Sequence, residues 1–587
     1  MYRAPLKDLS FVLNELLGAQ PLAGCPPHAD YSADLVESVL SESARFAEAV
    51  LDPINRSGDQ EGAHWSEAGV RTAKGFREAY RQFVEGGWPQ LRAPAHIGGQ
   101  GAPLMLATAV QETWASANLA FKLCPMLTYG AIHALELTAA PALKARFLPR
   151  MVTGEWTGTM VLTEPQAGSD LALIRTHATP QSADRSDGTF RLFGQKIFIT
   201  WGEHDFTDNI VHMVLARIDG APEGVRGISL FLVPKVLVGE NGELGARNDL
   251  RCVSIEHKLG IHASPTCVMA FGERDGAVGY LVGEPNRGLE YMFIMMNTAR
   301  LAVGLQGYAV AERAFQQAAD YARTRVQGRM PIIQHPDVKR MLLEMKSGTE
   351  AMRALTIYAA WQLDLAESHA DPKVRAQAQA RGDLLIPIVK GWSTEFGVEL
   401  ASTGIQVHGG TGFIEETGAA QWLRDVRITS IYEGTTGIQA NDLLGRKLVR
   451  DKGAAMMSLL NEVEQELTPP AAAAAVQAVR AEALRAAVQL RETTVTVLGL
   501  AAEDMDRALA VIEPYLMLCG FVLGGWLMAR AAHIVSAGGT AAGSEYKAAK
   551  LATARAYVGQ LLPRALSYRQ IVRSGAGSVA GVDAALI

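Results

Sequence analysis

The sequence has little cysteine, no apolar run of membrane-spanning length and no excess of positive charge. Its five cysteines are scattered and form no CxxC pair, which argues against a disulfide framework and a zinc site, so we expect no metal. The uncharged, strongly apolar run 514–529 is shorter than the roughly 20 residues that span a bilayer, and we expect a buried bundle helix there. The formal net charge of −6 gives no indication of a nucleic-acid surface.

The first residues also lack the long apolar region of a signal peptide. What the sequence does have is a hydrophobic content of 48% beside 20% charged residues, as in ordinary globular proteins. Together these features predict a cytoplasmic protein with no transmembrane segment and no nucleic-acid partner.

A chain of 587 residues is too long for one hydrophobic core, so several domains are expected. Apolar residues at helical spacing fill both ends of the chain, whereas the middle carries short strand-like runs separated by turn residues. We predict an α+β fold, mainly α. Its expected parts are an N-terminal helical extension at 1–35, an N-terminal helical domain at 36–158, a β-domain at 159–280, a C-terminal four-helix bundle at 281–450 and an additional C-terminal helical domain at 451–587.

The strand-like runs of the middle region have no helical segment between them. They predict an antiparallel sheet, arranged as a sandwich or barrel, rather than βαβ units. Phe190–Phe193 and Lys196–Thr200 flank Gly194-Gln195 in the manner of a β-hairpin, so we expect a turn there.

One carboxylate, Glu433, follows an apolar approach and comes directly before a Gly-Thr-Thr-Gly turn. Backbone N–H groups at such a bend are free to bind a ligand, which makes Glu433 a candidate general base beside an anion or carbonyl site. Taken alone, the motif is more often that of a surface glutamate opening a polar turn.

Two motifs of the β-region could approach a polar ring or a phosphate. The segment 161–170 runs from a strand into a Pro- and Gly-containing loop with hydroxyl groups at Thr163 and Ser169. Phe198 and Thr200 stand at alternate strand positions and could form a stacking wall with a hydrogen-bonding group. The alternatives are a plain β-turn and a core strand.

Three motifs of the helical region complete the set. Arg300 is a cation in the first turns of an apolar helix, and 321–329 places three arginines and a glutamine at the end of that helix. A solvated basic helix end is the simpler explanation of both. The Gly-rich segment 406–413 could lie against a pyrophosphate, although alone it is a weak signal.

The order of these motifs is more specific than any one of them. A helical domain, a β-domain with Thr-Glu-Pro-x-Ala-Gly-Ser-Asp, a four-helix bundle, Gly-Gly-Thr-Gly and Ile-Tyr-Glu-Gly-Thr together resemble the acyl-CoA dehydrogenases, over about 36–450. The N-terminal helix and the long C-terminal module are similar to a long-form bacterial subgroup. That subgroup includes the 3-methylmercaptopropionyl-CoA dehydrogenases and related fatty acyl-CoA dehydrogenases.

The resemblance implies an FAD enzyme that oxidises an acyl-CoA thioester, fatty acyl-CoA or 3-methylmercaptopropionyl-CoA, to the trans-2-enoyl-CoA. It implies that Glu433 removes the α-proton while hydride leaves Cβ for flavin N5, and that the N–H of Glu433 and a flavin ribityl hydroxyl polarise the thioester carbonyl. Some relatives place the base directly before the arginine that matches Arg300. Here that residue is Ala299, which cannot accept a proton, and this favours Glu433.

By position, the resemblance also implies a set of binding residues. The cofactor-binding set is Leu162, Thr163, Ser169, Phe198, Thr200, Arg325, Gln327, Gln406, Gly409, Gly410, Thr435 and Gly437. The substrate-binding set is Ser169, Asn297, Arg300 and Gly434. Gly437 stands where many relatives have glutamine, and Asn297 where many have aspartate.

The resemblance further implies an electron-transfer flavoprotein as electron acceptor and a homo-oligomer, dimer or tetramer. An acyl-CoA oxidase that uses O₂ is an alternative, since no sequence motif determines whether O₂ can reach the flavin. A DNA-associated flavoprotein of the alkylation-response type is disfavoured because the whole chain is acidic, with a formal net charge of −6. A catalytically dead partner subunit would not need Glu433. Acyl-chain length and head group stay open.

Overall fold

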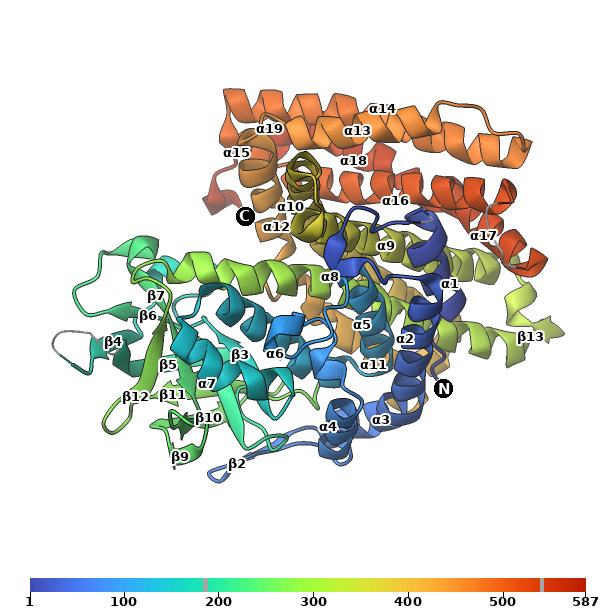
Figure 1. Ribbon diagram of the computed structural model, residues 1–587. Coiled ribbons are helices and arrows are strands. Elements are labelled where there is room, and N and C mark those ends of the chain that lie inside the picture. The colour runs from blue at the N-terminus through green and yellow to red at the C-terminus, as the bar shows by residue number, and fades with distance from the viewer. Residues whose placement is uncertain (19, 183–187, 539–542) are drawn as a thin grey trace. The chain divides into compact units, whose positions relative to one another are not determined.

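The computed structural model describes residues 1–18, 20–182, 188–538 and 543–587. It is mainly helical with a central β-region, as predicted (Figure 1). Contacts divide the chain into two compact units, and the predicted domain boundaries stay predictions. Unit 1 comprises Met1–Ala44, Pro103–Ser116 and Arg300–Ile587, and unit 2 comprises Arg45–Ala102 and Ala117–Ala299.

The centre of unit 2 is an eight-stranded sheet in the order β10-β11-β5-β12-β7-β6-β3, with β4 pairing to both β5 and β6. Two short hairpins, β1–β2 (His64–Ser66, Gly69–Arg71) and β8–β9 (Val236–Val238, Leu244–Arg247), lie outside it. The strands of the sheet are β3 (Trp156–Val161), β4 (His177–Pro180), β5 (Thr189–Thr200), β6 (Asn209–Ile218), β7 (Ile228–Pro234), β10 (Leu250–Ile255), β11 (Thr266–Phe271) and β12 (Ala277–Val282).

The prediction of an antiparallel sheet is wrong for two of its pairs. β3 runs parallel to β6, from Trp156 opposite Asn209 to Val161 opposite Val214, and β4 also runs parallel to β6. The long connection from β3 to β6 gives the chain room to return and enter in the same direction. β6 is buried at nearly every position, as strands with parallel neighbours commonly are.

The predicted hairpin at Gly194-Gln195 is also wrong, because β5 runs through it without a turn. The two halves of β5 have different partners: Thr189–Leu192 pairs with β12, and Gly194–Thr200 pairs with β11. A Cβ atom at position 194 would lie 2.4 Å from Oγ1 of Thr176. Glycine is therefore required there by close approach to a neighbouring segment and not by a turn.

Helices pack on this sheet within unit 2. α6 (Leu119–Thr138) crosses β3 so closely that a Cβ on Gly158 would lie 2.6 Å from Ala131. Phe147 of α7 (Pro141–Val152) packs on Trp156 of β3, with ring centroids 6.0 Å apart. The remaining α-helices of this region are α3 (Asp52–Glu61) and α4 (Phe76–Glu85), whereas α2 (Ala33–Phe46) belongs to unit 1 except for its last two residues.

The predicted four-helix bundle is present, and most of it belongs to unit 1. Its helices are α8 (Gly288–Thr324), which starts in unit 2, α9 (Pro336–Ser368), α10 (Pro372–His408) and α12 (Thr436–Asp442) with its π-helical continuation Leu443–Val449. α5 (Leu104–Ala117) packs against α8 and α9 and contributes Glu112, which pairs with the buried Arg353 at 2.6 Å. The short hairpin β13–β14 (Val326–Gln327, Met330–Pro331) follows α8, and α11 is Ala419–Val426.

The additional C-terminal helices belong to unit 1 and pack on the bundle (Figure 1). Trp526 of α16 contacts Tyr358 of α9, and Phe521 contacts Trp392 of α10, with ring centroids 5.2 and 5.7 Å apart. α16 is long and apolar enough to cross a membrane, yet 83% of its apolar stretch is buried within the fold, as in a core helix. These helices are α13 (Ala454–Leu467), α14 (Ala474–Glu503), α15 (Met505–Leu509), α16 (Ile512–Ser536), α17 (Ser544–Ala556), α18 (Arg564–Ser574) and α19 (Ala576–Val579).

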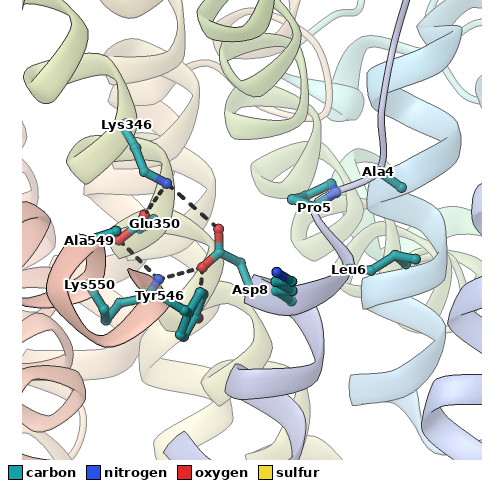
Figure 2. A pocket seen from close by; sticks show the side chains of 10 residues that line it. Ala4, Pro5, Leu6, Asp8, Lys346, Glu350, Tyr546, Ala549 and Lys550 are labelled. Atoms are coloured by element: carbon teal, nitrogen blue, oxygen red, sulfur yellow. Dashed lines mark hydrogen bonds and ion pairs between the residues drawn. The ribbon is translucent and has the colours of Figure 1, made fainter. Parts of the chain in front are cut away.

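The expected N-terminal helix is α1 (Leu6–Phe11), and it joins α9 and α17 around a pocket of about 390 Å³. Figure 2 shows Asp8 of α1 pointing toward Lys346 of α9 and toward Tyr546 and Lys550 of α17. Asp8 accepts from Lys550 at 2.6 Å and from Tyr546 at 2.8 Å, and Lys550 also pairs with Glu350 at 3.1 Å. Burial alone would raise the pKa of Asp8, but the ammonium groups of Lys550 and Lys346 hold it well below its usual range.

We expect Asp8→Asn to lower the stability of the protein at pH 7 by about 2–3 kcal/mol, because two ammonium groups then share the single carboxylate of Glu350. The pKa of Asp8 is depressed on folding, so its contribution is present above about pH 4 and fades as the pH falls below that value. Thermal unfolding between pH 3 and pH 7 measures this difference. Asp30→Asn, at an exposed site, should have no effect, and an equal loss for the Asp8 variant at pH 3 and pH 7 would contradict the assignment.

Candidate active site

Glu433 lies in a turn of unit 1 between a short 3₁₀ segment that ends at Ser430 and α12. Its φ is +57°, and that of Gly434 is +92°. For a side chain such as glutamate the left-handed conformation costs about 1–2 kcal/mol, so the surrounding structure must enforce it. Gly434 cannot be replaced easily, because its φ is strained for any residue with a Cβ atom, and that atom would also lie 2.7 Å from Nε2 of Gln439.

Two side chains hold the carbonyl groups of this turn. Gln439 donates to the carbonyl oxygens of Glu433 and Gly434 at 3.2 and 3.3 Å, and Nζ of Lys390 donates to that of Gly434 at 2.7 Å. In a trans peptide the N–H points away from the carbonyl, so the N–H groups of Gly434 and Thr435 face the opposite side. Within the described part of the chain, the N–H groups of Glu433, Gly434 and Thr435 donate to no other group. The turn thus presents free donors, as an oxyanion-binding site does.

The carboxyl group of Glu433 is partly buried in the field of two cations, Arg300 of α8 and Lys390 of α10. Burial raises the pKa of Glu433 to about 7, against the opposing effect of Arg300 and Lys390. Burial likewise lowers the pKa of Lys390 to about 7. Arg300 pairs with Asp442 at 3.0 Å. A carboxyl group with a pKa near neutrality is suited to abstract a proton at physiological pH.

Side chains on both sides of Glu433 fix the turn to the bundle. The hydroxyl of Tyr432 donates to Gln306 of α8, and the hydroxyl of Thr436 donates to Glu395 of α10 at 2.5 Å. Thr435 caps α12 by accepting a backbone N–H at 3.3 Å. Glu433 is therefore anchored through the residues before and after it.

The structure brings the predicted residues Arg300, Gly434, Thr435 and Gly437 together with Glu433. Gly437 is exposed in the first turn of α12, and a Cβ there would meet only Oγ1 of Thr435, at 3.8 Å. Asn297 lies one helical turn before Arg300 on α8, with its side chain exposed. Ala299, the position of the alternative base, is buried and apolar.

In unit 2, the predicted residues Leu162 and Thr163 are tied to β5. Ile197 N–H donates to the carbonyl of Thr163 at 2.9 Å, and Nζ of Lys196 donates to the carbonyl of Leu162 at 2.8 Å. Lys196 is fully buried and pairs with Glu164 at 2.8 Å. The loop that follows β3 is therefore fixed to β5 by one buried cation.

Glu164 organises the rest of that loop. It accepts from the N–H groups of Arg175 and Thr176 at 2.7 and 3.0 Å and from the hydroxyl of Thr176 at 2.6 Å. Burial alone would raise its pKa, but the ammonium of Lys196 and these hydrogen bonds lower the pKa of Glu164 to about 2. Ser169 lies beyond it, exposed beside Gly168, where a Cβ would meet no atom within 4 Å. The backbone of the loop is thus open to close approach.

Phe198 stands at a bulge of β5. β11 pairs Cys267 with Ile199 but Met269 with Lys196, so β5 carries one extra residue between these pairs. Phe198 has a φ of +60° and is 58% exposed, whereas Ile199 is buried. Thr200 is partly exposed, as is expected if it shares a face with Phe198. Strained bulges that aim an aromatic ring outward are common beside binding sites.

The other predicted cofactor residues form a second, exposed group in unit 1. Tyr321, near the end of α8, stacks on His408 at the end of α10, with ring centroids 4.6 Å apart. From Arg300 to Thr324, α8 is continuous over 25 residues, a rise of about 36 Å, so this group cannot reach the same small site as Glu433 within one chain. Its exposed members are Arg325, Gln327, Gln406, Gly409 and Gly410.

The motifs missed three residues that shape these sites: Lys390, Gln439 and Lys196. Each is a polar side chain within an otherwise apolar or regular segment and bonds a backbone carbonyl. For Lys390 a signal exists, since it is the only charged residue between Asp383 and Glu395. For Gln439 and Lys196 the sequence gives no comparable signal.

Glu433→Gln should stabilise the protein at alkaline pH. The folded-state pKa of Glu433 is raised, so folding opposes ionisation, and the cost grows as the pH rises from about 4.5 through 7. We expect the variant to exceed the parent by roughly 2–3 kcal/mol at pH 8 and to approach it at pH 4. Chemical unfolding at both pH values measures this, with the exposed Glu37→Gln as control; a variant less stable at pH 8 would contradict burial as the cause.

Lys196→Met should destabilise unit 2 by about 3–5 kcal/mol, because it leaves the carboxylate of Glu164 buried without its cation. The midpoint of urea unfolding measures the loss. Lys74→Met removes an exposed ammonium of the same unit and should change stability by less than about 0.5 kcal/mol. Equal midpoints for the two variants would show that the buried pair does not hold the loop.

Comparison with known proteins covers nearly the whole chain. The family profiles described as acyl-CoA dehydrogenase N-terminal, middle and C-terminal domains match 37–155, 159–273 and 286–448. A further profile, described as acetyl-CoA dehydrogenase C-terminal like, matches 459–583.

Individual proteins agree with the profiles. The chain is 49% identical to 3-methylmercaptopropionyl-CoA dehydrogenase of Ruegeria pomeroyi over 96% of each chain. It is 32% identical to the broad-specificity linear acyl-CoA dehydrogenase FadE5 of Mycobacterium tuberculosis, over 100% of this chain and 99% of that protein. An acyl-CoA dehydrogenase from Bacillus anthracis, solved with FAD, has a similar fold, with a TM-score of 0.74 at 22% identity over 92% of this chain and 88% of that one. The chain therefore belongs to the acyl-CoA dehydrogenase family and is an oxidoreductase with acyl-CoA dehydrogenase activity.

Proposed function

We propose that this protein introduces a trans double bond between Cα and Cβ of an acyl-CoA thioester, with Glu433 as the base that removes the α-proton. The observation that carries the proposal is the turn at Glu433. It combines a carboxyl group whose pKa is about 7 with free backbone N–H groups and two neighbouring cations.

The chemistry needs each part of this turn. An α-proton beside a thioester is weakly acidic, so the carbonyl oxygen has to be polarised as the proton leaves. The N–H of Glu433 is a donor suited to that oxygen. When the Cα–H bond breaks, the proton goes to the carboxylate of Glu433 and its electron pair forms the new Cα=Cβ bond, while Cβ loses a hydride.

FAD, when bound, supplies the hydride acceptor at N5. Several residues of this chain suit such a cofactor by their own chemistry. In unit 2, Phe198 presents an exposed aromatic ring, and the loop with Leu162, Thr163 and Ser169 offers backbone and hydroxyl groups. In unit 1, Thr435 and Gly437 flank the base with open space. Thr200 adds a partly exposed hydroxyl group.

Asn297 and Arg300 would bind the substrate together with Gly434 and Ser169. The name of the relative that is 49% identical to this chain makes 3-methylmercaptopropionyl-CoA the first substrate to test. FadE5 makes linear fatty acyl-CoAs the second. Electrons would then leave the reduced enzyme to an electron-transfer flavoprotein.

A homo-oligomer is part of the proposal. Arg325, Gln327, Gln406, Gly409 and Gly410 are exposed, and the length of α8 separates their group from Glu433. These residues would therefore contact the cofactor of a neighbouring subunit, and the enzyme would be a dimer or tetramer.

Anaerobic titration of the purified flavoprotein with a panel of acyl-CoAs tests the activity. We expect at least one of 3-methylmercaptopropionyl-CoA and the linear fatty acyl-CoAs to bleach the flavin absorbance. In Glu433→Gln the flavin should stay bound, but its reduction should slow by about 10²–10⁴-fold or more, because the base is lost. Glu37→Gln serves as the control with normal reduction. A parent enzyme that no acyl-CoA bleaches would refute the proposal.

A further inference from the structure

Lys390 is a fully buried lysine in a stretch of α10 that is otherwise uncharged from Leu384 to Thr394. Its neighbours Val389 and Trp392 are buried as well. Its ammonium donates to the carbonyl oxygen of Gly434 at 2.7 Å. Burial of an ammonium beside one neutral acceptor is costly, and a neutral residue of similar size would normally fit such a site better. The retained charge therefore needs an explanation.

The charged groups around Lys390 come from several elements. Its own helix supplies Glu395, the turn supplies Glu433 and α8 supplies Arg300. Behind them, Asp442 and Arg446 flank Arg300, and Glu513 of α16 lies near Glu395.

Two of these carboxylates already have other partners. Glu395 accepts the hydroxyl of Thr436 at 2.5 Å, and Asp442 pairs with Arg300 at 3.0 Å. Lys390 therefore interacts electrostatically with Glu433 in the turn and, more weakly, with Glu395 of its own helix.

The backbone geometry also indicates that Lys390 acts on the turn that carries Glu433. Glu433 adopts a left-handed conformation that a glutamate does not prefer, and its turn must be held from outside. The bond from Lys390 fixes the carbonyl of Gly434, and this orients the N–H of Thr435 away from α10. Lys390 is therefore placed to control both the direction of the turn and the ionisation of Glu433.

We propose that Lys390 is a positioning residue for the catalytic base: it fixes the peptide after Glu433, and its charge favours the ionised carboxylate that abstracts the α-proton. The inference rests on the proposed role of Glu433. Lys390 itself need not touch substrate or cofactor, and it transfers no proton in the reaction.

The test compares Lys390→Met, Lys390→Gln and Lys390→Arg as flavin-loaded, full-length proteins. Anaerobic single-turnover reduction is followed from pH 5 to pH 9 with an acyl-CoA that bleaches the parent. In both neutral variants the acidic limb of the plot of reduction rate against pH should move upward by about one pH unit. At pH values below both midpoints, this shift corresponds to a tenfold lower rate of flavin reduction. Gln, which can still donate to Gly434, should keep a higher limiting rate than Met, and Arg should keep the parental midpoint.

A second measurement needs no substrate. The infrared band of the protonated carboxyl group of Glu433, identified by its absence in Glu433→Gln, is titrated in each variant. The same upward shift is expected in Lys390→Met and Lys390→Gln. Lys346→Met, which removes an ammonium beside Glu350 on α9, is the matched control and should leave the midpoint unchanged.

Folded, flavin-loaded neutral variants with the parental midpoint would overturn the proposal, since a residue needed only for packing would change stability and not the pH profile. If Lys390→Met does not fold, Lys390→Gln decides by the same criterion. If neither neutral variant folds, Lys390→Arg, which retains the charge, decides. A shifted midpoint in that variant would count against the proposed role of Lys390, and the parental midpoint would support it. Failure of every acyl-CoA to bleach the parent would refute the proposed function, while the infrared titration would still judge Lys390.

Discussion

The active-site turn depends on a balance between burial and charge. A carboxyl group that is fully hydrated at neutral pH is a weak base, and one buried without cations would hold its proton. Glu433 lies between these limits because burial raises its pKa to about 7 while Arg300 and Lys390 oppose the rise. Arg300 is itself paired with Asp442, whereas Lys390 donates to a neutral carbonyl oxygen, so the balance belongs to the cluster rather than to one pair.

The active-site turn also depends on the orientation of its backbone carbonyl and N–H groups. Gln439 and Lys390 bind the carbonyl oxygens of the turn from one side, and the free N–H groups are consequently turned to the other. Donors and base are thereby fixed by the same two side chains. In unit 2, Lys196 has a similar task, because it joins β5 to the loop after β3 through a carbonyl group and through Glu164. In both places a buried lysine orders backbone that a motif alone would leave undefined.

Sequence patterns predicted the element types better than their connections. Helical spacing identified the bundle, and the order of the motifs identified the family. The parallel pairing of β3 with β6 could not be read from the sequence, because alternation shows that a segment is a strand but not which strand lies beside it. Gly194 was interpreted as a turn residue, whereas its role is close approach to Thr176. Lys390 belongs to no motif, since its partner is a carbonyl group 44 residues away along the chain.

The arrangement of Asp8 has a consequence for biosynthesis. Asp8 and Phe11 of α1 contact Lys550 and Tyr546 of α17, partners separated from them by more than 500 residues. A ribosome that adds about 5–20 residues per second needs on the order of half a minute to two minutes to make the intervening chain. During that time the apolar face of α1, including Leu9 and Phe11, has no C-terminal helix to cover it. The N-terminal segment is therefore made early but can reach its final packing only late, after α17 has been synthesised.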